Sequence, residues 1–213
     1  EGGVREAVVA ILEGDWGNTS RGHHVGPRAR ALLDDARDRV AATLKCKPSE
    51  IIFTSGGSES TNLALHGMAR QLRDKGRHII TSAVEHHAVL QPCAYLENNE
   101  GFEVTFLPVD SAGRVAVESV RLALRPDTVL VSIMAANNEV GTLQPVAEIG
   151  ELCAVKGVVF HTDAVQCFGK SSLGGIGVFN ADLVSLCAHK FHGPNGAGLL
   201  YAKSPLMPDP IVH

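Results

Sequence analysis

The feature that most constrains the fold is an alternation of strand-like and helix-like segments along almost the whole chain. Helix-like segments, with apolar residues at helical spacing, cover residues 27–45, 59–75, 88–99, 117–124 and 146–155. Short apolar or β-branched runs occupy residues 51–55, 78–82, 102–108, 128–134, 158–162, 182–187 and 197–202. Because parallel strands need a long crossover connection, such alternation is typical of βαβ units. The sequence therefore predicts an α/β fold: a mainly parallel sheet of about seven strands with helices on both faces. A short Gly-rich segment, 173–179, is expected to be a loop.

Charge and cysteine content narrow the function class. The net charge is −4 and basic residues are scattered, so neither nucleic acid nor membrane is expected as a partner. No apolar run approaches the roughly 20 residues of a membrane span, and the N-terminus lacks the features of a signal peptide. The five cysteines are widely spread and form no Cys-x-x-Cys pair, which favours a reducing compartment and a cytoplasmic protein, with a mitochondrial location as the alternative.

A first candidate site lies where the strand-like run at 51–55 meets two glycines. Gly57 and Ser58 stand at the start of the helical segment that follows. Glycines allow backbone N–H groups to approach an anion, and a helix N-terminus supplies unpaired donors. The segment is suited to a phosphate group, although a turn followed by an ordinary N-cap has the same pattern.

An acid and an amine follow two later strand-like runs. Asp163 ends one run, with Gln166 three residues on, and Lys190 follows the next. A lysine at a strand exit is a candidate Schiff-base former, and a carboxylate there can keep a pyridine nitrogen protonated, as pyridoxal 5′-phosphate (PLP) requires. Taken singly, Asp163 could be a helix cap and Lys190 a solvated amine; together with the phosphate segment they favour PLP.

Two further strand ends carry polar side chains. His86 could stack on a planar cofactor or move protons, or it could be a surface or capping histidine. Asn137 and Asn138 could hydrogen-bond a cofactor hydroxyl, or they could close a turn. The residue types alone leave these alternatives open.

Taken together, these motifs resemble the cysteine desulfurases and selenocysteine lyases, which belong to the class V aminotransferase group of fold-type I PLP enzymes. The resemblance runs from about residue 17 to the C-terminus. It implies removal of sulfur or selenium from cysteine or selenocysteine to leave alanine. The motifs are Gly-Gly-Ser-Glu-Ser (56–60), Glu-His-His (85–87), Asn-Asn-Glu-Val-Gly (137–141), His-Thr-Asp-Ala-Val-Gln (161–166) and His-Lys-Phe-His-Gly-Pro (189–194).

The resemblance also implies a role for each matching residue. Lys190 and His86 would be catalytic, with Lys190 binding the cofactor covalently and His86 stacking on its ring. Asp163 would pair with the pyridine nitrogen. The other cofactor-binding residues would be Asn138 and Gln166 near the ring hydroxyl, and Gly57, Ser58 and His189 at the phosphate. No metal site is assigned.

Departures from the family pattern set further expectations. Cys187 stands where a serine is common, and it is a poorer donor to phosphate. Residues 1–213 are expected to be the PLP-binding large domain, truncated at both ends. The small C-terminal domain, with its sulfur-accepting cysteine and substrate-binding arginine, is expected to be missing. Expected partners are a small amino-acid substrate, a second copy in a homodimer and a sulfur-acceptor protein.

Three alternatives remain from the residues alone. One is another class V lyase or an aminotransferase, and a second is a non-catalytic PLP-binding fragment. The third is a metal-dependent hydrolase that uses His161, Asp163, His189 and His192 as ligands. A lysine between two ligands would be unfavourable beside a cation, which weighs against the third.

Overall fold

The protein is built around one seven-stranded sheet, as predicted. The structure, a computed structural model, describes residues 2–14, 18, 25–170 and 174–212. The strand order is β1-β7-β6-β5-β4-β2-β3. The strands are β1 (Ile51–Thr54), β2 (His78–Ser82), β3 (Glu103–Leu107), β4 (Thr128–Ser132), β5 (Val159–Asp163), β6 (Leu183–Cys187) and β7 (Gly198–Ala202).

Strand β7 lies between β6 and β1 and is antiparallel to both. It pairs antiparallel with both, so β1 runs in the same direction as β6. Its first residue, Gly198, is the partner of Thr54 on one side and of Cys187 on the other. Because Thr54 and Cys187 are the last residues of their strands, β7 begins at the sheet edge where the other strands end. The C-terminal ends of β1, β5 and β6 therefore share one edge.

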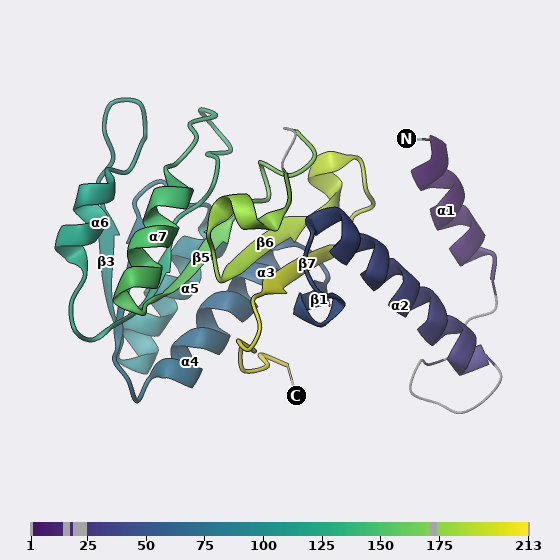
Figure 1. Ribbon diagram of the computed structural model, residues 1–213, viewed down its shortest axis with the longest axis horizontal. Coiled ribbons are helices and arrows are strands. Elements are labelled where there is room, and N and C mark those ends of the chain that lie inside the picture. Colours follow the sequence, from purple (N-terminus) through teal and green to yellow (C-terminus); the bar gives the residue numbers. More distant parts are fainter. Residues whose placement is uncertain (1, 15–17, 19–24, 171–173, 213) are drawn as a thin grey trace.

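Helices cover both faces of the sheet (Figure 1). One face carries α2 (Val25–Leu44), α6 (Val117–Ala123) and α7 (Val146–Lys156). The other carries α5 (His87–Glu100) and a continuous helical segment made of α3 (Gly57–Asn62), a π-helical turn (Leu63–Gly67) and α4 (Met68–Leu72). α1 (Gly2–Leu12) has no buried residue and stands clear of the sheet (Figure 1).

Three short 3-10 turns complete the described elements. They span Pro48–Glu50, Ile176–Phe179 and Ala188–Phe191. The turn at Ile176–Phe179 corrects the expectation that residues 173–179 form a loop, since Ile176 and Phe179 are buried and hold this segment against the core. Residues 171–173 lie outside the described part of the chain.

Two apolar cores lie on opposite faces of the sheet. Side chains alternate along each strand, so Leu130 and Val131 of β4 enter different cores, as do Leu183 and Val184 of β6. Phe160 of β5 is fully buried. Such continuous apolar strands are typical of a parallel sheet buried on both faces.

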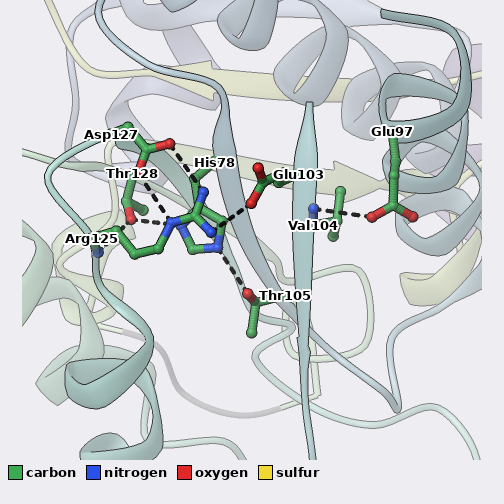
Figure 2. Close-up of polar contacts among 8 residues, drawn as sticks. All are labelled: His78, Glu97, Glu103, Val104, Thr105, Arg125, Asp127 and Thr128. Atoms are coloured by element: carbon green, nitrogen blue, oxygen red, sulfur yellow. Dashed lines mark hydrogen bonds and ion pairs between the residues drawn. The ribbon is translucent and has the colours of Figure 1, made fainter. Parts of the chain in front are cut away.

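A polar network connects the N-terminal ends of β2, β3 and β4, at the opposite edge of the sheet (Figure 2). The His78 ring lies between Thr128, at 2.7 Å from Nδ1, and Thr105, at 2.8 Å from Nε2. Burial lowers the pKa of His78, so its ring is neutral near pH 7. Arg125 extends the network to Glu103, with 2.6 Å between nitrogen and oxygen. This edge is held together by polar contacts among its own residues.

Candidate active site

All eight predicted site residues line one cavity at the C-terminal edge of the sheet. The cavity has a volume of about 180 Å³. Cys187 and four apolar residues complete its wall, the latter being Ala88, Met134, Ala136 and Val165. The predicted residues are Gly57, Ser58, His86, Asn138, Asp163, Gln166, His189 and Lys190. Motifs that are far apart in the sequence therefore meet in space.

One wall of the cavity is the turn from β1 into α3. Gly57 and Ser58 are the first residues of α3, whose leading N–H groups have no acceptor within the helix. A Cβ on Gly57 would lie 2.8 Å from Val165 Cγ2, and one on Gly198 would lie 2.6 Å from Gly56 Cα. Only glycine fits at these contacts, which bring the backbone donors up to the cavity. This wall is suited to an anion.

Asp163 forms a second wall at the end of β5. Its Oδ1 accepts a hydrogen bond from Val165 N at 3.0 Å, so it caps the following turn as well as lining the cavity. Burial raises the pKa of Asp163, and nearby His86 partly opposes this shift. A cationic N–H in the cavity would favour the ionised carboxylate.

Lys190 projects from the 3-10 turn after β6. The turn ends at His192, whose φ is +70°. Gly193 then folds back on Ala188, so closely that a Cβ on Gly193 would lie 2.6 Å from Ala188 Cβ. This tight reversal places the exposed Lys190 side chain on the cavity wall, on the same edge of the sheet as Asp163.

His86 caps a helix and also lines the cavity. Its Nδ1 accepts a hydrogen bond from Ala88 N at 3.1 Å, which makes His86 the N-cap of α5. An accepting Nδ1 places the proton of the neutral ring on Nε2. The ring also lines the cavity, so capping fixes the orientation in which it meets a ligand.

The two asparagines after β4 differ in what they contact. Asn137 closes the turn: its Oδ1 accepts from Glu139 N and Val140 N, each at 2.9 Å, and its Nδ2 donates to Val84 O. Asn138 is exposed and lines the cavity.

Sequence reasoning missed a contact between Cys187 and His189. Cys187 Sγ lies 2.8 Å from His189 Nδ1, and both side chains line the cavity. The spacing Cys-x-His at a strand end was the only available signal. It fixes neither the backbone of the turn nor the two rotamers on which the contact depends.

Sequence reasoning also gave no role to Glu85, which is buried next to the site. Its Oε1 accepts from Ser82 Oγ at 2.6 Å and from Met134 N at 3.0 Å, whereas Oε2 finds no partner among the described residues. Burial raises the pKa of Glu85 to about 8. The side chain is therefore largely a neutral acid at pH 7.

The geometry removes the metal-dependent hydrolase suggested as an alternative. Both ring nitrogens of His161 are occupied, Nδ1 by Ser132 Oγ at 2.8 Å and Nε2 by Ser185 Oγ at 2.9 Å. Burial lowers the pKa of His161 to about 3. Within the described ranges, no three His, Cys, Asp or Glu residues are grouped as metal ligands.

Comparison with known proteins places the chain in a family. The sequence profile of the family "Aminotransferase class-V" matches residues 3–209. The chain belongs to the class-V aminotransferase family. Its similar sequences include the cysteine desulfurases IscS of Dictyoglomus turgidum and Methanosarcina thermophila. Each is 47% identical over 210 residues, which cover 99% of this chain and 53% and 52% of the respective relative. The chain thus spans about half the length of the curated relatives it matches.

Two solved structures of similar proteins agree with this fold. A NifS-like protein superposes with a TM-score of 0.94 at 40% identity, covering all of this chain (100%) and 58% of that one. A structure described as SspA in complex with cysteine gives a TM-score of 0.92 at 38% identity, covering 99% and 61%. Among the described residues, no helix is long and apolar enough to cross a bilayer.

Class-V aminotransferases and cysteine desulfurases are PLP-dependent. The residues of the cavity fit that cofactor. They provide an amine in Lys190, a buried carboxylate in Asp163, an imidazole face in His86, and a glycine-lined helix N-terminus at Gly57 and Ser58. These are the groups needed for an aldehyde, a pyridine nitrogen, an aromatic ring and a phosphate.

Proposed function

We propose that this chain forms the PLP-binding large domain of a cysteine desulfurase-like enzyme, which removes sulfur from cysteine and leaves alanine. The observation that carries the proposal is that Lys190, Asp163 and the Gly57–Ser58 turn are walls of one cavity. The similarity to cysteine desulfurases supports the reaction type.

Each wall has a proposed task. Bound PLP supplies an electron sink for charge that develops at the substrate α-carbon. Asp163 accepts a hydrogen bond from the pyridine nitrogen and keeps it protonated. His86 would lie against the ring, and Asn138 and Gln166 would hold its hydroxyl group.

The phosphate end and the proton transfers involve other residues. Gly57 and Ser58 donate backbone and hydroxyl hydrogen bonds to the phosphate, with His189 beside them. Lys190 Nζ would hold the cofactor aldehyde, and its free amine would be placed to take a proton from the substrate α-carbon. His86 is the second group placed to move a proton, through Nε2.

The proposed substrate is cysteine, because one structural neighbour is described in complex with cysteine. Selenocysteine differs only in the chalcogen and is the competing substrate of the same reaction. Proposed partners are a second copy of the chain and a protein that accepts the released sulfur.

Borohydride reduction with PLP, followed by peptide mass spectrometry, tests the site. We expect the reduced adduct on Lys190 and none in Lys190→Ala. Lys203→Ala is the matched control, because Lys203 follows β7 and lies outside the cavity, with its Nζ 4.0 Å from Asp182 Oδ1. This substitution should leave the adduct unchanged. An adduct on another lysine would refute the assignment.

Product analysis then tests the reaction. Incubation with cysteine should give alanine and sulfide, and selenocysteine should give alanine and selenide. A keto acid in place of alanine would identify an aminotransferase and would contradict the proposed reaction while leaving the cofactor site intact.

A further inference from the structure

The pair formed by Cys187 and His189 is not explained by the proposed reaction. Cys187 is the last residue of β6, and its thiol sulfur contacts His189 Nδ1 at 2.8 Å. The residue is only 2% exposed, yet it lines the cavity. The cavity is therefore the route by which a reagent reaches this thiol.

The thiol adjoins the wall that is suited to an anion. Cys187 Sγ lies 3.9 Å from the position a Cβ would take on Gly56, and Cys187 Cβ lies 3.5 Å from that position on Gly57. Atoms added to the sulfur would enter a cavity of only about 180 Å³ beside the first turn of α3. They would occupy the space proposed for a phosphate.

The other four cysteines differ from Cys187 in their position, and the pKa of each of their thiols is raised. None of them lines the cavity. Burial is the main cause that raises the pKa of each thiol and so disfavours the reactive thiolate. The pKa is raised to about 11 in Cys46, to about 12 in Cys93 and in Cys153, and above its usual value in Cys167.

We propose that Cys187 is a modification site for small disulfides and that its modification blocks cofactor loading. This inference rests on the proposed PLP site for its consequence, but the modification itself does not require the cofactor. Thiol oxidation state would then decide whether the protein can take up PLP.

The chemistry is thiol–disulfide exchange. The Cys187 proton passes to His189 Nδ1, and the thiolate attacks one sulfur of a small disulfide. A new S–S bond forms at Cys187, the S–S bond of the reagent breaks, and the leaving thiolate carries away the electron pair and later takes up a proton. A thiol reductant reverses the reaction.

Methyl methanethiosulfonate provides a probe that adds only an S–CH₃ group and releases a sulfinate. In the purified protein without PLP, mass spectrometry should find Cys187 labelled about tenfold faster than any other cysteine. PLP, and inorganic phosphate more weakly, should slow this labelling. Equal labelling of Cys46 and Cys187 would overturn the proposal, and so would an unchanged labelling rate of Cys187 in protein that carries PLP on Lys190.

The imidazole partner has its own test. His189→Gln should slow labelling of Cys187, because the proton acceptor is lost, whereas His87→Gln, outside the cavity, should not. Equal rates in all three proteins would show that the Cys187–His189 contact does not activate the thiol.

Cofactor uptake completes the test. Methylthiolated protein should bind PLP about tenfold more weakly, with recovery after reduction. Cys187→Ser, compared with its own untreated affinity, should be insensitive to the reagent. If labelling of Cys187 leaves PLP uptake unchanged, the proposal that this modification blocks cofactor loading is refuted. If PLP never binds Lys190 although Cys187 is labelled first, the proposed cofactor site fails and the modification site stands.

Discussion

Two carboxyl groups lie buried at or beside the cavity, Asp163 on its wall and Glu85 behind it. Burial raises the pKa of both. They differ in what surrounds them: Asp163 faces the cavity, where a ligand can compensate its charge, whereas Glu85 Oε1 is committed to Ser82 and Met134. A cationic ligand should therefore lower the pKa of Asp163 and leave the pKa of Glu85 raised.

Asp163→Asn tests the first role. The amide keeps the shape but cannot stabilise a protonated pyridine nitrogen, so we expect PLP still to be trapped on Lys190 while alanine formation falls by about 100-fold or more. Asp127→Asn, at the opposite edge of the sheet, should change neither quantity. Normal alanine formation in Asp163→Asn would leave Asp163 only its capping role.

Glu85→Gln tests the second role through the pH dependence of stability. The folded protein holds the Glu85 proton up to a pKa of about 8, whereas the unfolded chain releases it near its usual value of 4.5. The folded state thus binds more protons between these pH values, and the stability contributed by Glu85 is lost as pH rises from about 4.5 to 8.

The free energy of unfolding of Glu85→Gln should therefore rise relative to that of the wild type as pH rises. Denaturant unfolding at pH 5 and pH 8 should show a relative gain on the order of 4 kcal/mol, since one pKa unit corresponds to about 1.4 kcal/mol. Glu151→Gln, exposed on α7, is the control and should give no pH-dependent difference. A flat difference for Glu85→Gln would mean that Glu85 is ionised in the folded protein.

Most cavity residues could be predicted because the ends of parallel strands meet at one edge of the sheet. That reasoning brought Asp163 and Lys190 together without any coordinates. It could not reveal the burial of Glu85 or the contact of Cys187 with His189. Burial depends on which distant segments cover a residue, and a side-chain contact depends on rotamers that no periodicity encodes.

At the scale of elements, α7 packs closely against the 3-10 turn at Ile176–Phe179. A Cβ on Gly150 would lie 2.3 Å from Asn180 O, a backbone atom that cannot move aside freely. Asn180 itself donates from Nδ2 to Ala147 O at 3.2 Å, which ties the turn to the helix. Glycine is thus required at position 150 because the backbone of Asn180 leaves no room for a side chain, and not because of the conformation of the helix.

Gly150→Ala should consequently destabilise the protein even though alanine favours helices. We expect the free energy of unfolding to fall by about 1 to 3 kcal/mol, as measured by denaturant unfolding. Gly3→Ala in α1 is the matched control, because nothing lies within 4 Å of its added Cβ, and it should leave global stability unchanged or slightly raised. Equal effects of the two substitutions would contradict this packing.

The seven strands agree with their predicted positions to within about two residues because β-branched and apolar runs mark buried strands. The strand order and the reversed direction of β7 could not be obtained in the same way. A strand buried on both faces has the same apolar pattern in either direction. The π-helical turn at Leu63–Gly67 was likewise absorbed into one predicted helix, since it hardly changes the apolar spacing.

At the scale of the whole molecule, the cavity is assembled from α3, β5 and the turn after β6, so a ligand there binds only the folded sheet. PLP at 100 times its Kd should add about 2.7 kcal/mol to the free energy of global unfolding. Hydrogen exchange should show that increment for amides of β1, β5 and β6, which we expect to open only with the whole sheet. Amides of α1, which has no buried residue, should gain nothing.

Lys190→Ala provides the control, since it should lose most of the increment in every strand. A gain confined to amides that line the cavity would show that the sheet does not unfold as one unit.

The place of β7 in the sheet has a consequence for synthesis on the ribosome. Among the described strands, β1 pairs only with β7, which leaves the ribosome about 150 residues later. At ordinary translation rates this is a delay on the order of 10 s, during which the nascent chain carries a strand without a partner. The Gly57–Ser58 turn cannot take its final position until β7 arrives. We therefore expect the complete site to form only after β7 has been synthesised, late in translation of this chain.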